Sequence, residues 1–416
     1  MQTYSIALDK GAIFGDDGLA GSHITMNNGG RINEDMKWDK SYKGNIGLDF
    51  SVLQGRLGFN LDAYYVWDRD MLLAFSGTIP TTVGATGAPQ NYGEMNSWGS
   101  EISVTWRDKI GKDFKYKVQL NTGFSDNKVL QAEWPTSDYF RGLIQGERTD
   151  RGQWGYQCIG MFRNYQDIEE YFSQYNISTY MGLTKDQVRP GMLIYKDVRG
   201  QLKADAANFE GADKYNGPDG IVDGLDLVRL SNRSNPYHFT LNLNAEYKDF
   251  AITAQLGASW GGYSFVPGSA LSPGDGVASN NSLGYKRLEY VNMPSFWNPD
   301  NMYVYDDIYD AEGNLLMKAN HDAHYPNLRW TNVNAQTSSF WRVSGTRINL
   351  NRVTLAYKIP KNICKFVGIS SARVNVTGQN LLSLYNPYPD NFIDPMMSYG
   401  VYPTLRKFTV GLNISF

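Results

Sequence analysis

The stretch SYKGNIGLDFSVLQGRLGFNLDAYYVWD, residues 41–68, alternates between apolar and polar side chains with a period of two. Ile46 and Leu48 share one face of its first half, and Leu57 and Leu61 share one face of its second half. A Gln-Gly pair separates the halves. Period-two alternation is typical of a β-strand with one buried or lipid-covered face, so the stretch predicts a hairpin with an apolar and a polar side.

The same alternation recurs along the chain in segments of about ten residues, the length that a tilted strand needs to cross a bilayer. We predict ten strands, near residues 3–9, 41–53, 56–68, 98–107, 114–125, 237–247, 250–260, 347–357, 372–381 and 405–416. No run of 18 or more uncharged apolar residues predicts a transmembrane helix.

The connections between these strands alternate in length. The short ones are 54–55, 108–112, 248–249 and 360–371, and the long ones are 10–40, 69–97, 126–236, 261–346 and 382–404. Outer-membrane barrels have short periplasmic turns and long extracellular loops. The sequence therefore predicts an all-β fold, an antiparallel transmembrane β-barrel portion with long extracellular loops.

The composition narrows the function classes. The 39 basic and 42 acidic residues give a net charge of −3, which excludes the basic footprint of a nucleic-acid-binding protein. Aromatic residues reach 14%, with 28 Tyr and 10 Trp, and Tyr42, Trp67, Trp106, Tyr247 and Trp260 lie near predicted strand ends. Aromatic girdles of membrane barrels occupy such positions, whereas a soluble β-sandwich, the alternative fold, favours Val and Ile in its core-facing strands.

The predicted topology also places the two cysteines. Cys158 falls in an extracellular loop and Cys364 in a periplasmic turn, so the two are expected to be free thiols, roughly a bilayer apart.

The last segment, TVGLNISF, ends on an aromatic residue after an apolar alternation. It resembles the terminal signal that the barrel assembly machinery recognises by strand addition. Thr409, Gly411, Ile414 and Phe416 are the candidate signal residues.

Several longer motifs together resemble the SusC/RagA family of TonB-dependent outer-membrane transporters, across nearly the whole chain. They are MKWDKSYKGNIGLDFSVLQGRLGFNLDAYYVWDRDMLL (36–73), NYGEMNSWGSEISV (91–104), GYQCIGMFRNYQDIEEY (155–171), RPGMLIYKDVRG (189–200), SSFWRVSGTRINLNRVTLAYKIP (338–360), SSARVNVTGQNLLSL (370–384) and GVYPTLRKFTVGLNISF (400–416). The resemblance implies a plugged barrel of about 22 strands, of which residues 1–416 would be the C-terminal part.

The resemblance also implies function. Such a transporter sits in the outer membrane of a Gram-negative bacterium, imports glycans or peptides, is capped by a SusD-like surface lipoprotein and is driven by TonB. The plug domain, the TonB-binding box and the signal peptide would lie upstream of Met1, so the fragment alone is expected to be inactive. A truncated reading frame, a cleaved piece and one chain of a split barrel remain open.

An acidic stretch, DKYNGPDGIVDGLD, lies in the longest predicted loop. Asp213, Asn216, Asp219, Asp223 and Asp226 offer the hard oxygen ligands that Ca²⁺ takes. Counted from Asp213, the EF-hand spacing is not met, and a solvated loop with Asx turns is the alternative.

Aromatic residues of the long loops are candidate ligand platforms, because flat amphipathic rings suit sugars and peptides. The candidates are Trp260, Tyr263, Trp154, Trp297 and Trp330, which suit a lid interface or the lipid girdle equally. We expect no enzyme, since His321 and His324 lack a GxSxG nucleophile motif. A barrel enzyme or adhesin and a soluble β-sandwich carbohydrate-binding protein are the alternatives.

Overall fold

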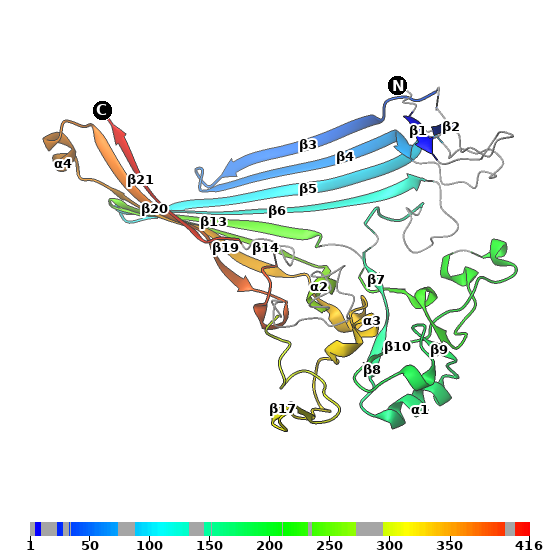
Figure 1. Ribbon diagram of the computed structural model, residues 1–416. Helices are drawn as coiled ribbons and strands as arrows, with labels where there is room; N and C mark the ends of the chain where they lie inside the picture. The colour runs from blue at the N-terminus through cyan, green and yellow to red at the C-terminus, as the bar shows by residue number, and fades with distance from the viewer. Residues whose placement is uncertain are drawn as a thin grey trace. The chain divides into compact units, whose positions relative to one another are not determined.

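The computed structural model describes most of the 416 residues. The described residues are 5–9, 23–27, 33, 35–73, 88–132, 145–150, 152–209, 211–231, 235–271, 294–395 and 404–416. One nine-stranded sheet dominates, in the order β21-β20-β19-β14-β13-β6-β5-β4-β3 (Figure 1). Its strands are β3 (Lys40–Val52), β4 (Leu57–Leu73), β5 (Gln90–Ile110), β6 (Phe114–Gln131), β13 (Tyr237–Tyr247), β14 (Phe250–Trp260), β19 (Arg347–Lys358), β20 (Ser371–Tyr385) and β21 (Lys407–Ser415).

The chain forms two compact units. Unit 1 comprises residues 1–47, 62–100 and 125–149, and unit 2 comprises residues 48–61, 101–124 and 150–416.

In unit 2 the strand registers separate an apolar face of the sheet from a polar face. One row of paired residues crosses six strands and is apolar: Tyr116, Ala245, Ile252, Leu355, Val376 and Val410. The adjacent row is polar: Lys117, Asn244, Thr253, Thr354, Thr377 and Thr409. Leu355 is 54% and Val410 73% exposed, and no second sheet of the described residues covers them. The two-sided pattern is confirmed, and the β-sandwich alternative is wrong.

The short connections behave as predicted. Residues 53–56 and 111–113 turn the chain, Lys248-Asp249 form a two-residue turn, and α4 (Lys361–Phe366) lies in the fourth connection. Backbone hydrogen bonds join successive turns, from Arg107 to Arg56, Lys248 to Asp113 and Lys358 to Asp249. The alternation of tight turns with long excursions is therefore confirmed.

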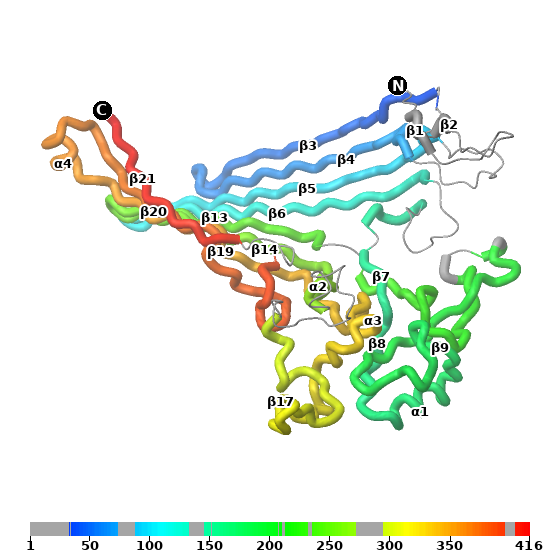
Figure 2. The backbone as a smooth tube through the Cα atoms, in the orientation of Figure 1, coloured from blue at the N-terminus to red at the C-terminus, as the bar shows by residue number. Residues whose placement is uncertain are grey.

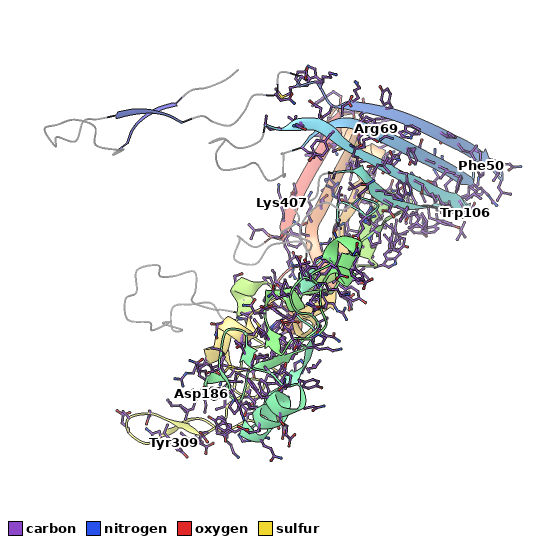
Figure 3. All side chains as sticks on the ribbon, turned by 90° about the vertical axis from the view of Figure 1, so that its right-hand side faces the viewer. Phe50, Arg69, Trp106, Asp186, Tyr309 and Lys407 are labelled. Carbon is purple, nitrogen blue, oxygen red and sulfur yellow. The ribbon has the colours of Figure 1, made fainter. Side chains whose placement is uncertain are left out.

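Aromatic side chains lie close to these turns. Phe50 stacks on Phe59 with ring centroids 5.0 Å apart, and the Trp106 indole donates to the Tyr116 hydroxyl at 3.2 Å. Phe50 and Trp106 lie near the tips of their strands (Figure 3). Their positions match those expected of an aromatic girdle.

Two strand predictions need correction. The segment predicted at 3–9 contains β1 (Ser5–Asp9), which among the described residues pairs with β2 (His23–Asn27) and not with the main sheet, so that sheet has nine described strands instead of ten. β4, β5 and β6 have 17, 21 and 18 residues, longer than the alternation indicated. Runs of polar residues interrupt the alternation in their outer portions, at residues 68–70 of β4, 90–91 of β5 and 125–128 of β6, so the pattern predicted shorter strands.

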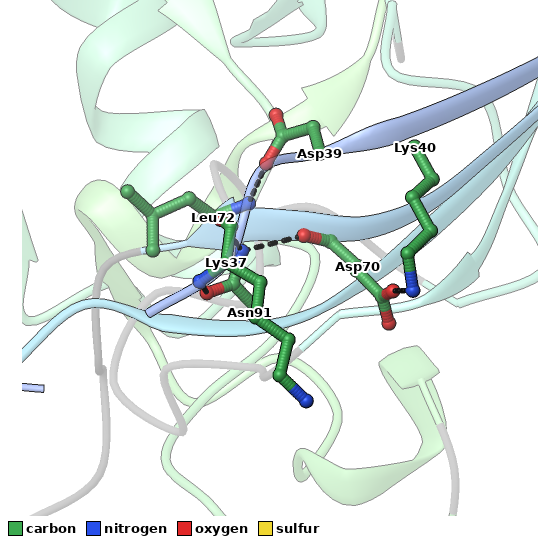
Figure 4. Close-up of polar contacts among 6 residues, drawn as sticks. All are labelled: Lys37, Asp39, Lys40, Asp70, Leu72 and Asn91. Atoms are coloured by element: carbon green, nitrogen blue, oxygen red, sulfur yellow. Dashed lines mark hydrogen bonds and ion pairs between the residues drawn. The ribbon is translucent and has the colours of Figure 1, made fainter. Parts of the chain in front are cut away.

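In unit 1, Asn91 at the start of β5 ties neighbouring strands together (Figure 4). Its amide nitrogen donates to the carbonyls of Lys37 at 2.8 Å and Asp70 at 2.7 Å, while its oxygen accepts from the Lys37 N–H at 2.8 Å. Asp70 has φ +54° and forms an ion pair with Lys40. This network explains why the first residue of the NYGE motif is an asparagine, whose side chain can both donate and accept hydrogen bonds.

The long connections of unit 2 carry many short elements. These are β7 (Trp154–Gly155), β8 (Cys158–Met161), α1 (Tyr165–Gln174), β9 (Thr179–Tyr180), η2 (Lys185–Gln187), β10 (Leu193–Tyr195), η3 (Ala206–Asn208), η4 (Gly211–Lys214), β11 (Ile221–Val222), η5 (Gly224–Asp226), β12 (Val228–Arg229), β15 (Tyr263–Phe265), α2 (Gly268–Leu271), β16 (Ile308–Tyr309), β17 (Leu315–Met317), η7 (Leu328–Trp330), α3 (Thr331–Asn334), η8 (Ser339–Trp341), β18 (Arg342–Ser344) and η9 (Pro389–Asn391). Helix α1 begins at the Asn164 cap, whose side chain accepts from the Asp167 N–H, and it buries Ile168, Tyr171 and Phe172 on one face. The described helices are all short. Among the described residues no helix is long and apolar enough to span a bilayer.

These elements form one hydrophobic core, which we call the loop body (residues 154–231, 263–271 and 294–344). Its largest fully buried side chains include Phe162, Tyr180, Tyr195, Phe296 and Trp341. A bridge between Tyr156 and Ser338 joins the segments directly, and they lie side by side in Figure 2. The main buried core of unit 2 therefore lies in its long loops, whereas the sheet leaves its apolar face exposed.

Candidate functional site

A polar pocket lies where β15, β18 and the start of β19 meet the segment after β20. It measures about 180 Å³ and is lined by Asn235, Tyr263, Ser264, Ser344, Gly345, Arg347, Pro387, Tyr388 and Pro395. We call it the loop-base pocket. The Ser264 and Tyr388 hydroxyls are 2.8 Å apart across it.

The arginines of this region are fixed by neighbouring groups. Arg347 donates from Nε to the Ser259 hydroxyl at 2.8 Å and from Nη1 to the Pro395 carbonyl at 2.9 Å. The Arg342 guanidinium lies 4.4 Å from the centroid of the Tyr263 ring. A held guanidinium is well suited to a carboxylate or a sugar hydroxyl, because little side-chain entropy is lost on binding.

Close backbone approach shapes the pocket wall. A Cβ at Gly345 would lie 2.4 Å from the Asn235 side-chain oxygen and 2.8 Å from the Gly262 carbonyl. That same Asn235 oxygen accepts from the Gly262 N–H at 3.0 Å. Gly261 has φ +96°, a conformation that a side chain disfavours. The WGGYSF and RVSG motifs therefore need these glycines for a local backbone reason.

The five predicted aromatic residues occupy different environments. Tyr263 lines the loop-base pocket and is 50% exposed. Trp260 lies in register with Tyr237 on the apolar face, where girdle residues belong. Trp154 and Trp330 are half-buried beneath arginine guanidinium groups. Trp297 is 7% exposed, donates to the Ala270 carbonyl at 2.9 Å and packs in the loop-body core. Only Tyr263 lines the loop-base pocket, and ligand binding by any of the five stays a prediction.

Two buried aspartates hold the acidic stretch, and one of them, Asp197, is not among the predicted ligands. Asp226 is fully buried and accepts from the N–H groups of Val198 and Arg199. Asp197 is 7% exposed and accepts from the Gly220 N–H at 2.7 Å. Burial raises the pKa of both the Asp197 and the Asp226 carboxyl groups.

The remaining acidic candidates are more exposed. Asp219 is exposed and Asp223 half-buried, and each accepts from a nearby backbone N–H, of Ile221 and Leu225 respectively. Asp213 and Asn216 are exposed. In the described part of the chain, no three His, Cys, Asp or Glu side chains are spaced as metal ligands.

The two loop histidines take part in ring packing. His321 stacks on Tyr303 and Tyr305, and its Nε2 lies 2.6 Å from the Tyr305 carbonyl. His324 packs against Tyr325 and Phe340. Both rings therefore take part in the packing of the loop body.

Buried tyrosines hold the loop body together. The Tyr171 hydroxyl donates to the Tyr195 carbonyl at 2.6 Å, and that of Tyr195 donates to the Val333 carbonyl at 2.8 Å. Burial raises the pKa of Tyr303 to about 12, and it raises the pKa values of Tyr171, Tyr180 and Tyr195 further. The GYQCIGMFRNY and FWRVSG motifs therefore contribute core side chains. Cys158, at the edge of this core, and Cys364 in α4 are both free thiols, as the topology predicted.

Comparisons with known proteins agree with this architecture. Residues 11–157 match the family model described as "TonB dependent receptor-like, beta-barrel". The chain is 24% identical over 422 residues to TonB-dependent receptor P3 of Formosa agariphila, covering 97% of this chain and 36% of that protein. It is 23% identical to TonB-dependent receptor SusC of Bacteroides thetaiotaomicron, covering 92% of this chain and 33% of that protein. The chain thus spans about a third of the length of these relatives.

Solved structures give the same fold. The RagAB peptide importer in its "closed-closed" state matches with a TM-score of 0.62 at 16% identity, covering all of this chain and 38% of that one. The "open-open" state matches with a TM-score of 0.61 at 17% identity. The chain is therefore similar to the β-barrel of TonB-dependent receptors, in its matched residues and in its fold. Among those receptors the similar proteins include SusC and the RagAB importer, in agreement with the resemblance of its motifs.

Proposed function

We propose that the protein is part of an outer-membrane TonB-dependent importer of glycans or peptides that works with a SusD-like surface lipoprotein. One observation carries the proposal: an exposed apolar sheet face spans six strands in unit 2, which also contains the tight turns and the folded loop body. A lipid environment accounts for the exposed apolar face, since water-facing surfaces of soluble proteins rarely hold such a patch.

The loop-base pocket supports a role in ligand capture. It combines two tyrosine rings, serine hydroxyls and a held arginine, a set that can bind sugar hydroxyls or a peptide carboxylate. Its volume suits one small group of a ligand, so a longer chain would extend beyond it.

The hairpin β16–β17 supports a protein partner. Ile308 and Tyr309 on one strand and Leu315 and Leu316 on the other are between 44% and 60% exposed. An apolar hairpin at the surface of a loop is typical of a protein interface. We assign it to the lipoprotein lid.

Transport is tested in the natural host with the intact gene. Uptake of labelled oligosaccharides and labelled short peptides is measured with and without the gene, and with TonB inactivated. We expect one of the two ligand classes to lose uptake in both mutants. Unchanged uptake of both classes would overturn the proposal.

A pocket variant links transport to this site. Tyr263→Ala should reduce uptake, whereas Tyr165→Ala, which alters an exposed tyrosine outside the pocket lining, should not. Equal uptake by the two variants would show that the loop-base pocket has no role in import.

A further inference from the structure

A groove opens on the apolar face of the sheet in unit 2, close to the short turns. It has a volume of about 340 Å³ and is lined by residues of β6, β13, β14, β19 and β20, nearly all of them apolar. A volume of this size lies within the range of small-molecule sites. The groove is separate from the loop-base pocket, with which it shares no lining residue.

The sizes of neighbouring side chains create this groove. Ala245 pairs with Tyr116 on β6 and with Ile252 on β14, so a small residue lies between two larger ones on the same face. At the turn end of the groove, Phe250 and Tyr357 pack with their ring centroids 4.7 Å apart. Branched aliphatic side chains continue the lining away from the turns. Aromatic rings followed by aliphatic groups match the interfacial zone and the hydrocarbon zone of a bilayer.

Lysines gather at the aromatic end of the groove. We call the segments 112–113, 248–249 and 358–370 the turn belt, which contains five lysines and two aspartates. Backbone N–H groups of one segment donate to carbonyls of the next, at 3.2 Å and 2.8 Å, so the three segments are neighbours. The Lys248 ammonium lies 5.4 Å from the centroid of the Tyr247 ring, which lines the groove. Among the described residues, no ion pair joins a belt lysine to a carboxylate.

The longest segment of the turn belt has the composition of a membrane-surface segment. Residues 358–370 carry three lysines and no carboxylate. They include α4, which lies where β20 begins (Figure 1). Ile363, Phe366 and Val367 are exposed, Phe366 by 90%. Exposed apolar side chains beside lysines are typical of a segment at the boundary between headgroups and acyl chains.

We propose that this groove holds an acyl chain of an anionic phospholipid, from the leaflet on the side of the short turns, with its phosphate near Lys248 and the other belt lysines. A lysine stem can lie along an apolar surface while its ammonium group stays among the headgroups. The inference rests on the proposed function in one respect, because it requires the apolar face to lie in a bilayer.

Charge complementarity selects this occupant over the others that an apolar groove could take. The excess of lysines attracts an anionic headgroup, whereas a lipid without net charge gains nothing from it. A second copy of this chain, docked symmetrically, would bring its own belt lysines toward these, and like charges repel. An anionic phospholipid satisfies the apolar groove and the lysines together.

Lipid binding is measured on the intact receptor, purified in detergent and stripped of lipid. Phosphatidylglycerol, or phosphatidylcholine with the same acyl chains, is added, and bound lipid is counted by native mass spectrometry. We expect phosphatidylglycerol to bind in preference and to raise the Tm more than phosphatidylcholine does, because a ligand that binds only the folded state stabilises it.

A pair of variants tests the groove. Ala245→Phe fills it and should remove the binding of phosphatidylglycerol and the rise in Tm that the lipid causes. Ala254→Phe makes the same change on the same face, opposite Leu243 and Val353 and outside the groove lining, and should bind the lipid as the natural protein does. Both variants keep the face apolar, so both should assemble in the membrane.

A second pair tests the headgroup contact. Lys248→Asn removes the charge nearest the groove and should lower the preference for phosphatidylglycerol over phosphatidylcholine by about fivefold. Asparagine suits this position because Lys248 has φ +54°, in the left-handed region. Lys117→Asn, on the polar face opposite Asn244, should keep the preference.

Four results would overturn the proposal. They are equal binding of the two lipids by the natural protein, undiminished binding by Ala245→Phe, an equal loss in Ala254→Phe, and an undiminished preference in Lys248→Asn. A receptor dimer in detergent that Ala245→Phe separates would assign the groove to a second copy and would also overturn it. None of these measurements involves uptake, so a failure here leaves the transport proposal in place, and unchanged uptake leaves lipid binding in place.

Discussion

At the scale of single residues, the same side-chain type has opposite roles in different loops. Trp297 and Tyr263 were predicted as equivalent ligand platforms, yet Trp297 is a core residue and Tyr263 lines a pocket. Local sequence could not separate them, because the partners of Trp297 include Trp341 and Tyr325, which lie far along the chain. Asp197 was missed because its backbone partner, the Gly220 N–H, lies 23 residues further along the chain.

Asn334 is the polar centre of the loop body. It is 3% exposed; its amide nitrogen donates to the carbonyls of Gly191 and Asn327, and its oxygen accepts from the Leu193 N–H at 2.8 Å. Asn334→Ala leaves three buried backbone groups without these partners, which should destabilise the loop body by about 2–5 kcal/mol. Hydrogen exchange of the 191–195 segment should accelerate. The exposed Asn332→Ala serves as the control, and matching exchange rates in both variants would contradict this role.

Buried tyrosines predict instability at high pH. The pKa of Tyr303 is raised to about 12 by burial, whereas an unfolded tyrosine titrates near 10. Between these values the unfolded chain loses the proton first, so the free energy of unfolding falls as the pH rises above about 10. Thermal unfolding across an alkaline series should show this decline, and Tyr303→Phe should make it shallower. An unchanged slope in Tyr303→Phe would show that other tyrosines alone carry the effect.

At the scale of the strand, period-two alternation predicted most of the sheet, because one face of the sheet is apolar and the other is polar. The prediction failed where the two faces of a strand do not differ in polarity. Segment 3–9 alternates in sequence, but its described part, β1, pairs with β2 and not with the main sheet, and β5 continues through the polar NYGEMNS portion. Register depends on the partner strand as well as on local pattern.

Facing within β13 gives a matched test. Leu243 pairs with Val118 and Ala254 on the apolar face, whereas Asn242 pairs with Gln119 and Gln255 on the polar face. Leu243→Arg should cost about 2–4 kcal/mol near the middle of the bilayer, and Asn242→Arg much less. Assembly of the intact receptor is measured by its heat-modifiable migration in gels. Similar losses for both variants would contradict a lipid-covered face.

At the scale of the whole molecule, the sequence predicted long outer loops but not their shared core. Such a core depends on contacts like that between Tyr156 and Ser338, which join loops separated by two strands of the main sheet, β13 and β14. The sequence pattern of one loop does not show which residues of another loop it packs against. The motif resemblance agrees with the comparisons because its motifs come from both loops.

A folded loop body changes what a partner protein can bind. A flexible loop would have to be ordered on binding, at a cost in free energy, whereas a surface fixed by a buried core is already ordered. The hairpin β16–β17 is therefore the strongest candidate for the contact with the lipoprotein lid that we propose.

Leu316→Asp on this hairpin should abolish co-purification of the lipoprotein with the receptor, because a charge in an apolar interface loses its hydration without a partner. Leu202→Asp makes the same change at a similarly exposed site, 50% against 60%, and should retain the lipoprotein. Both variants should assemble in the membrane as the natural protein does, since neither side chain lies in the core. If Leu316→Asp retains the lipoprotein, the hairpin does not form the lid contact. Loss of the lipoprotein in both variants would indicate a general effect of added charge.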